Sequence, residues 1–227
     1  MNEIDHIKEN WRNCVWAHTL SDAEGARMIP HIQFASLAAG QYIWRRGDPS
    51  DYWVGMARGS MKLCATSPQG KQVTFTGMAM AWIGEDGLVT GKPRACDAVV
   101  LLDAMVAKMP RVVFMELLRS NPEFNLFVMQ QMSERVNQFM ELIAFDRMLS
   151  PIDKVARSLA ALFNAKLFPP RSLLLKITQN EVAEFCNMSR SRVNTALKRL
   201  ETEGLILNGY NQITILDLSA LQRYAEV

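Results

Sequence analysis

The chain has 227 residues, of which 49% are apolar and 21% are charged. This composition is typical of a folded protein of one or two domains and excludes a disordered chain. The longest stretch without a charge, residues 28–44, contains Pro30 and Gln33 and is too polar to span a bilayer. The four cysteines are scattered, which excludes a disulfide framework or a zinc finger. Because Glu3 and Asp5 make the start unlike a secretion signal, we expect a cytoplasmic protein with no membrane partner.

Residues 1–30 are the first predicted element, a helical segment whose apolar residues recur every three or four positions. From residue 34 to residue 107 the pattern changes to short apolar runs, separated by turn signals such as Gly47-Asp48-Pro49 and Arg58-Gly59-Ser60. Short strands punctuated in this way predict a β-barrel or β-sandwich. The clearest predicted strands are residues 52–56, 61–65, 72–77 and 98–107.

A long helix is predicted over residues 121–148, where apolar residues recur at spacings of three and four and glycine is absent. Asn121 followed by Pro122 is a typical helix start, and the helix would be about 40 Å long. Such a helix either packs on the barrel or forms a coiled-coil-like interface with a second copy, and its length favours the second interpretation. The residues expected at this interface are Phe124, Val128, Met132, Arg135, Phe139 and Leu142.

The carboxy-terminal part carries the most informative motif. Thr178 and Glu181 have the spacing of a capping box, and residues 186–188 form a short turn before Ser189, a typical helix cap. Two short helices joined by such a turn predict a helix-turn-helix. Residues 204–216 follow as two short strands, which predict a β-hairpin wing.

The second of these helices would present a polar face that suits duplex DNA. Arginine pairs with guanine and asparagine with adenine in the major groove, while lysine suits phosphate. The net charge of this part is also consistent with DNA binding, because residues 149–227 hold 10 Lys or Arg against 7 Asp or Glu. The alternative is a helical pair that serves only for packing or protein binding. The expected DNA-binding residues are Thr178, Gln179, Ser189, Arg190, Ser191, Arg192, Asn194, Thr195, Lys198 and Arg199.

With these motifs in this order, the chain resembles the Crp/Fnr family of bacterial transcription regulators. The landmarks of the resemblance are Gly47-Asp48, Arg58-Gly59-Ser60, Pro68-Gln69-Gly70-Lys71 and Gly84-Glu85-Asp86-Gly87-Leu88. It implies an α+β fold with an N-terminal β-roll, a cyclic-nucleotide-binding-like jelly roll, as the effector-sensing domain over residues 1–120. A long central dimerisation helix over residues 121–149 and a C-terminal winged helix-turn-helix DNA-binding domain over residues 150–227 would follow.

The resemblance also implies an effector site made of Gly84, Glu85, Arg94 and Ala95. In the cyclic-nucleotide-binding members a Glu holds the ribose hydroxyl and an Arg pairs with the cyclic phosphate, and Glu85 and Arg94 match these residues in type. Ala95 stands where those members have a hydroxyl. Three interpretations stay open: a cyclic nucleotide, another small anionic or apolar effector, or no small effector. Glu85 and Arg94 could also form a plain surface ion pair.

No cofactor is assigned, and neither an iron–sulfur cluster nor haem is expected. Cys14 stands alone near the amino terminus, where the oxygen-sensing branch of the family has a cysteine cluster. We expect no metal site, and no enzyme, because residues 34–107 contain no histidine for a cupin-type metal centre.

The resemblance implies a homodimer on palindromic double-stranded DNA, with RNA polymerase as a partner. Arg190 keeps the first arginine of the best-known recognition helices, but Ser191 and Thr195 replace a Glu and a second Arg, so we expect a different half-site. The alternative function is a ligand-sensing regulatory subunit that acts through a partner protein rather than DNA.

Overall fold

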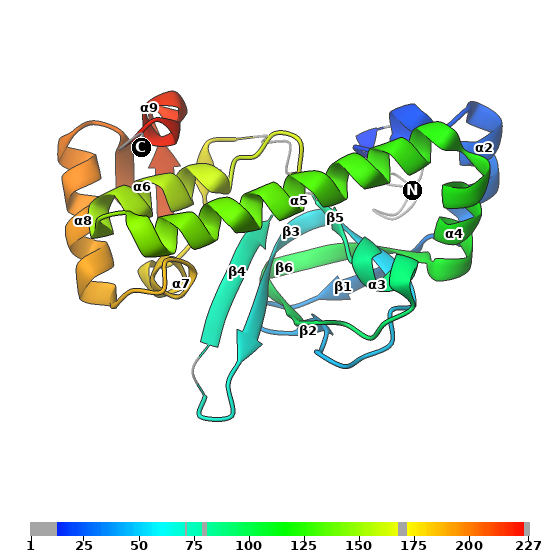
Figure 1. Cartoon of the computed structure of the whole chain (residues 1–227), viewed down its shortest axis with the longest axis horizontal. Coiled ribbons are helices and arrows are strands. Elements are labelled where there is room, and N and C mark those ends of the chain that lie inside the picture. Colours follow the sequence, from blue (N-terminus) through cyan, green and yellow to red (C-terminus); the bar gives the residue numbers. More distant parts are fainter. Residues whose placement is uncertain (1–12, 71, 79–80, 168–171, 225–227) are drawn as a thin grey trace. The chain divides into compact units, whose positions relative to one another are not determined.

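The computed structural model describes residues 13–70, 72–78, 81–167 and 172–224 (Figure 1). The chain divides into two compact units. The first unit contains residues 1–63 and 78–135, and the second contains residues 64–77 and 136–227. Residues 1–12 of the predicted amino-terminal helical segment and Lys71 of the family landmarks lie outside the described residues. Within the described ranges, no helix is both long enough and apolar enough to cross a membrane.

The first unit is built on an antiparallel sheet with short helices before and after it. The strand order is β1-β6-β3-β4, with β2 paired to β6 and β5 to β3, so the chain folds back on itself as a β-roll. The elements of this sheet and of the helices before and after it are η2 (Ala17–Thr19), α2 (Asp22–Met28), η3 (Ile29–His31), β1 (Gln33–Leu37), β2 (Tyr42–Trp44), β3 (Tyr52–Thr66), β4 (Gln72–Met78), β5 (Trp82–Ile83), α3 (Glu85–Thr90), β6 (Asp97–Pro110) and α4 (Arg111–Ser120). Residues 64–66 of β3 and 72–77 of β4 are assigned to the second unit.

The predicted strands are present, but the two predicted over residues 52–56 and 61–65 form a single strand. Strand β3 runs without interruption from Tyr52 to Thr66, so Arg58-Gly59-Ser60 is not a turn as predicted. Gly59 keeps a positive φ of 89° inside the strand, and a Cβ at this position would lie 2.7 Å from the carbonyl oxygen of Asp103. Glycine is therefore required for the close approach of β6 at a local distortion of a continuous strand.

The described part of the predicted amino-terminal helical segment is helical, and it consists of three short pieces. Leu20 is extended between η2 and α2, and Ser21 starts α2 with a capping box in which Ser21 and Glu24 bond each other's backbone. A serine that can cap a helix competes with continuing the previous one, which explains the break.

Aromatic side chains fill the core of the first unit. Trp16, Trp53 and Phe114 are at most 1% exposed, and the rings of Trp53 and Trp82 lie 4.7 Å apart. Trp16 meets Trp82 edge-on at 5.3 Å, and Phe124 packs against Trp53 at 5.7 Å. Large buried aromatic pairs of this geometry stabilise a core beyond their buried area, so this cluster anchors the amino-terminal segment and the start of the long helix on the sheet.

The long helix α5 (Pro122–Met148) has the predicted extent. Asn121 caps it, since its Oδ1 accepts a hydrogen bond from the backbone N–H of Phe124 at 2.9 Å. The helix is continuous over 27 residues, and its residues belong to the first unit up to Arg135 and to the second unit from Val136.

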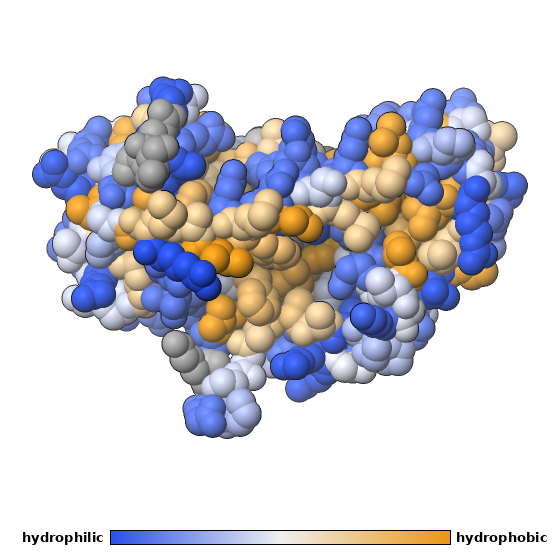
Figure 2. Space-filling model, viewed as in Figure 1, coloured by the Kyte–Doolittle hydropathy of each residue, from blue (hydrophilic) through white to orange (hydrophobic). Residues whose placement is uncertain are grey.

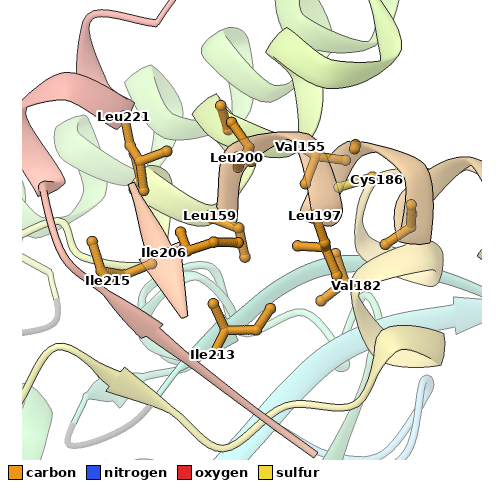
Figure 3. Packing of buried hydrophobic residues seen from close by; sticks show 14 of the residues in the cluster. Val155, Leu159, Val182, Cys186, Leu197, Leu200, Ile206, Ile213, Ile215 and Leu221 are labelled. Carbon is orange, nitrogen blue, oxygen red and sulfur yellow. The ribbon is translucent and has the colours of Figure 1, made fainter. Parts of the chain in front are cut away.

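The second unit contains the predicted helix-turn-helix and wing. Ser150 caps α6 through the N–H of Asp153, and β8 pairs antiparallel with β9 to form the hairpin. One hydrophobic cluster joins all of these elements, with Val155, Leu159, Val182, Leu197 and Ile213 at its centre (Figure 3). The elements are α6 (Pro151–Ala161), β7 (Leu174–Leu175), α7 (Gln179–Phe185), α8 (Arg190–Thr202), β8 (Ile206–Gly209), β9 (Gln212–Ile215) and α9 (Leu218–Gln222).

Candidate functional site

The helix pair α7–α8 forms because each helix has its own cap. The side chain of Thr178 accepts from the N–H of Glu181, whose carboxylate accepts from the N–H of Thr178 in return. Asn187 makes the turn with a left-handed φ of 47°, which asparagine tolerates better than most residues. Ser189 then starts α8 by accepting from the N–H of Arg192.

Helix α8 has one buried face and one solvent-exposed face. Val193, Ala196, Leu197 and Leu200 pack into the cluster of the second unit. The opposite face exposes several of the predicted DNA-binding residues, and these are Arg190, Ser191, Arg192, Thr195 and Lys198. The apolar face packs α8 against the core of the second unit. The polar face is exposed, as it is in a helix that enters a groove of DNA.

Other predicted DNA-binding side chains have partners within the chain. The Gln179 amide and the Oδ1 of half-buried Asn194 are 3.5 Å apart, which ties α7 to α8. Arg199 donates to Glu203 at 2.6 Å, and the same carboxylate accepts from the hydroxyl of Tyr224. This hydrogen bond from Tyr224, followed by the one from Arg199, lowers the pKa of Glu203. Arg199 therefore stabilises the end of α8 in addition to any contact with phosphate.

Two residues near the recognition face are absent from the sequence prediction. A cleft of about 580 Å³ lies at the start of α8, and Asn180 and Asn187 line it together with Arg190 and Arg192. Both asparagines are exposed. Their signal in the sequence was weak, because one follows a helix cap and the other lies in a turn, where asparagine is common for conformational reasons.

A polar contact holds the helix-turn-helix to the end of α5. Lys154, which is nearly buried on α6, forms an ion pair with Asp146 of α5. The hydrogen bond from Lys154 is the main reason why the pKa of Asp146 is lowered, and a further hydrogen bond from Asn187 acts in the same direction. The side chain of Asp146 thus connects the long helix, α6 and the turn before the recognition helix.

In the first unit, Glu85 is buried and engaged on both carboxylate oxygens. Oε1 accepts from Nε of Arg135 at 2.6 Å, and Oε2 accepts from the indole N–H of Trp53 at 3.3 Å. Arg135 also donates from Nη2 to the carbonyl oxygen of Trp82 at 2.5 Å. The interpretation of Glu85 as part of a surface ion pair with Arg94 is wrong, because Glu85 is only 3% exposed and its cationic partner is Arg135.

Arg94 is buried as well, and its guanidinium bonds to backbone. Nη1 donates to the carbonyl oxygen of Gly84 at 3.0 Å, Nη2 donates to that of Tyr52, and the group lies 4.2 Å from the centre of the Trp44 ring. Burial lowers the pKa of Arg94, although nearby carboxylates such as Asp86 oppose this shift. Of the four predicted effector-site residues, three are buried in this arrangement, and Ala95 is exposed.

The two side chains that the resemblance assigns to a cyclic nucleotide both bond within the chain in this structure. A cyclic nucleotide needs an acceptor for a ribose hydroxyl and a donor for a phosphate, and Glu85 and Arg94 already have partners in the chain. Among the described residues, no group of three or more His, Cys, Asp or Glu side chains could hold a metal ion.

The outward face of α5 is apolar along most of its length (Figure 2). Leu126, Met129, Val136, Met140 and Ile143 are each between 52% and 57% exposed. Two residues predicted for the interface, Phe124 and Val128, are buried in the core of their own unit, and a third, Arg135, bonds Glu85. Leu142 and Met132 are half-buried, and Phe139 is exposed. Most of the predicted stripe therefore faces the chain's own interior.

Comparison with known proteins agrees with this architecture. A cyclic nucleotide-binding domain model matches residues 34–121, and a Crp-like helix-turn-helix domain model matches residues 153–224. The chain belongs to the Crp/Fnr family of transcription regulators. The predicted β-roll followed by helices and a helix-turn-helix is confirmed, and the family assignment favours a DNA-binding regulator over a subunit that acts through a partner protein.

Relatives of this Crp/Fnr regulator are distant but match along most of the chain. The cAMP-activated global transcriptional regulator CRP of Haemophilus influenzae is 22% identical over 90% of this chain and 93% of the relative. The fumarate and nitrate reduction regulatory protein of Vibrio cholerae is 23% identical over 83% and 76%, respectively. The solved structure of FixK2 from Bradyrhizobium japonicum is 14% identical, with a TM-score of 0.74 over 86% of this chain and 98% of that one, and shows the same fold.

Proposed function

We propose that this regulator acts as a homodimer that binds an inverted repeat in double-stranded DNA through two copies of α8. The observation that carries the proposal is the division of α8 into a buried apolar face and an exposed face with Arg190, Ser191 and Arg192 at its amino-terminal end. The first residues of a recognition helix are those that reach base edges. Arg190 and Arg192 suit guanine, and Lys198, two turns on, suits a phosphate.

The proposed dimer interface is the exposed stripe of α5. Residues 126, 129, 133, 136, 140 and 143 alternate in spacings of three and four, which is the heptad pattern of a two-helix coiled coil. Ser133 is the one polar residue in this series, and it is exposed like the others. Exposed apolar residues in such a row are typical of a partner helix, and a second copy with two-fold symmetry supplies the same row. The recognition helices would then contact half-sites roughly 34 Å apart.

Control through the β-roll completes the proposal. The effector-sensing domain would be residues 1–120, the dimerisation helix residues 121–149 and the DNA-binding domain residues 150–227. A cyclic nucleotide or another small anionic effector at Glu85 and Arg94 would meet side chains that Arg135 and two backbone carbonyls already hold in place. Action in the cytoplasm and contact with RNA polymerase at a promoter are part of the proposal, and membership of the family supports them.

The proposal is tested by selecting bound sequences from random duplex DNA with the full chain and by measuring the mass of the complex in sedimentation. We expect an inverted repeat with half-site centres about one helical turn apart, bound by two copies. Selection of single half-sites, or binding of one copy, would contradict the dimer. Failure to enrich any sequence would contradict base-specific recognition by α8.

A further inference from the structure

A pair of side-chain amides links the first residue of α7 to the recognition helix. Gln179 donates from Nε2 to Oδ1 of Asn194, and the two atoms lie 3.5 Å apart, at the long end of the hydrogen-bond range. Both side chains are half-buried. The cap before Gln179 is Thr178, whose own side chain accepts from the N–H of Glu181. The capping box therefore leaves the Gln179 amide to act on α8.

The two helices are packed tightly where these amides meet. Val182 of α7 lies in the same hydrophobic cluster as Leu197 of α8 (Figure 3), and neither side chain is exposed. The N–H of Met188 donates to the carbonyl oxygen of Ala183 at 2.9 Å across the turn between the helices. Because close-packed apolar side chains hold two backbones at a fixed separation, a side chain on α7 acts on α8 at one defined position.

Asn194 lies in a row of polar residues on α8. It follows Arg190 by four residues and precedes Lys198 by four, and residues four apart are neighbours on one side of a helix. Arg190 and Lys198 are both exposed. Asn194 therefore stands between the arginine proposed to read a base and the lysine proposed to bind a phosphate.

A carboxamide reads a base according to which of its two ends faces that base. Adenine needs both ends, because its N7 accepts a hydrogen bond and its N6 donates one. The bond from Gln179 uses one lone pair of Oδ1 and leaves the other lone pair and both Nδ2 protons of Asn194 for a base. It also holds Oδ1 on the side of α7. Without this bond the amide could turn by 180° and exchange its donor and its acceptor.

We propose that Gln179 is a positioning residue for base recognition: it holds the carboxamide of Asn194 with its oxygen toward α7, so that Asn194 reads adenine at one position of each half-site. This inference rests on the proposed DNA-binding function. It also changes the role expected for Gln179, which the sequence placed among the residues that contact DNA. Gln179 sets the base preference through Asn194 rather than through a DNA contact of its own.

The test is a double-mutant cycle on base preference, made with the full chain. The variants are Gln179→Met, Asn194→Ala and the two combined; methionine has a similar length to glutamine and cannot donate a hydrogen bond. Sequences are first selected from random duplex DNA with the wild type and with Asn194→Ala. The half-site position at which Asn194→Ala loses the preference for adenine is the one that Asn194 reads. Affinities for all four bases at this position are then measured at one salt concentration.

We expect the wild type to prefer adenine at this position by roughly tenfold and Gln179→Met to lose most of that preference. In the Asn194→Ala background, Gln179→Met should cause no further loss of base preference. Additive losses in the double variant would show that Gln179 reads DNA itself and would overturn the inference. An unchanged preference in Gln179→Met would overturn it as well.

A second variant, Gln179→Glu, changes the direction of the hydrogen bond. A carboxylate cannot donate, so Asn194 would have to turn Nδ2 toward α7, and the preference for adenine should fall as far as in Gln179→Met. The matched control Asn180→Asp places the same charge on the next residue, which is exposed. This control should weaken all sequences alike and keep the preference for adenine. Retention of the preference in Gln179→Glu would contradict the inference.

The outcomes separate this inference from the proposed function. If the wild-type chain enriches no sequence, the proposed function fails, and the inference fails with it. If the wild type enriches an inverted repeat but Asn194→Ala changes no base preference, only the inference fails. Because acidic residues stabilise the first turn of a helix, Gln179→Glu also decides the matter if Gln179→Met does not fold.

Discussion

Truncation of Arg135 to alanine is expected to destabilise the first unit by about 3–5 kcal/mol, which is typical for removing one member of a buried ion pair. This loss of stability is expected because the truncation leaves the charge of Glu85 buried without a cationic partner. Glu85 would keep only the hydrogen bond from Trp53, at a position where its side chain is 4% exposed. The carbonyl oxygen of Trp82 would lose its bond to Arg135 as well.

The double variant Glu85→Gln with Arg135→Met provides the matched comparison. It removes both charges and keeps similar volume, and such neutral replacements often restore or exceed the original stability. We therefore expect the double variant to be more stable than Arg135→Ala alone. Both are measured by urea unfolding at one fixed protein concentration, because the proposed dimerisation would make the free energy of unfolding depend on concentration.

Tryptophan fluorescence suits this measurement because all five tryptophans lie within residues 1–63 and 78–135. The signal therefore reports the unfolding of the first unit alone. A loss below about 1 kcal/mol in Arg135→Ala would refute the reasoning, since the pair would then contribute no more than one on the surface. A double variant as unstable as the single one would also refute it.

Three further predictions concern the second unit and the dimer. Val136→Glu should convert the proposed dimer to monomers in sedimentation, whereas Asn137→Glu, at the neighbouring exposed position, should stay dimeric. The opposite result would show that the interface lies elsewhere on the helix. Arg190→Ala should relax base preference by about 1–3 kcal/mol at one position, while Lys198→Ala should weaken all sequences alike and reduce the salt slope by about 1. Equal effects on cognate and random DNA would contradict these roles. Because the pKa of Asp146 is lowered in the folded chain, its stabilising effect is present above its ordinary value of 3.8 and is lost as the pH falls through the folded value. Asp146→Asn should remove this part of the loss of stability at low pH, followed by circular dichroism. If the variant loses stability at low pH in the same way as the wild type, this role of Asp146 is contradicted.

The sequence predicts the helix-turn-helix well because its signals are local. The Thr178–Glu181 capping box and the Ser189 cap each act over three residues, and the structure contains both. The continuous strand β3 was not predictable in the same way. Gly59 is a turn signal in isolation, and only the close approach of β6 shows why glycine occurs inside a strand.

The same reasoning explains why the exposed stripe of α5 differs from the interface residues predicted from the sequence. The helix carries two apolar stripes with the same period, one with Phe124 and Val128 and one with Met129 and Val136. Periodicity alone does not tell which stripe packs on the chain's own core. The partner of Glu85 was equally hidden, because Arg135 lies 50 residues further along the chain and only the tertiary fold brings the two together.

Ser133 gives the proposed helix pair a fixed alignment. In two parallel copies related by two-fold symmetry, the small hydroxyl of one helix meets its counterpart at the same height, where both can share a hydrogen bond or a water molecule. Sliding one helix by a heptad would set Ser133 against Leu126 or Met140 and leave the hydroxyl without a polar neighbour. A single small polar residue in an otherwise apolar row would therefore oppose slippage and hold the two recognition helices of the proposed dimer at the same level on the duplex.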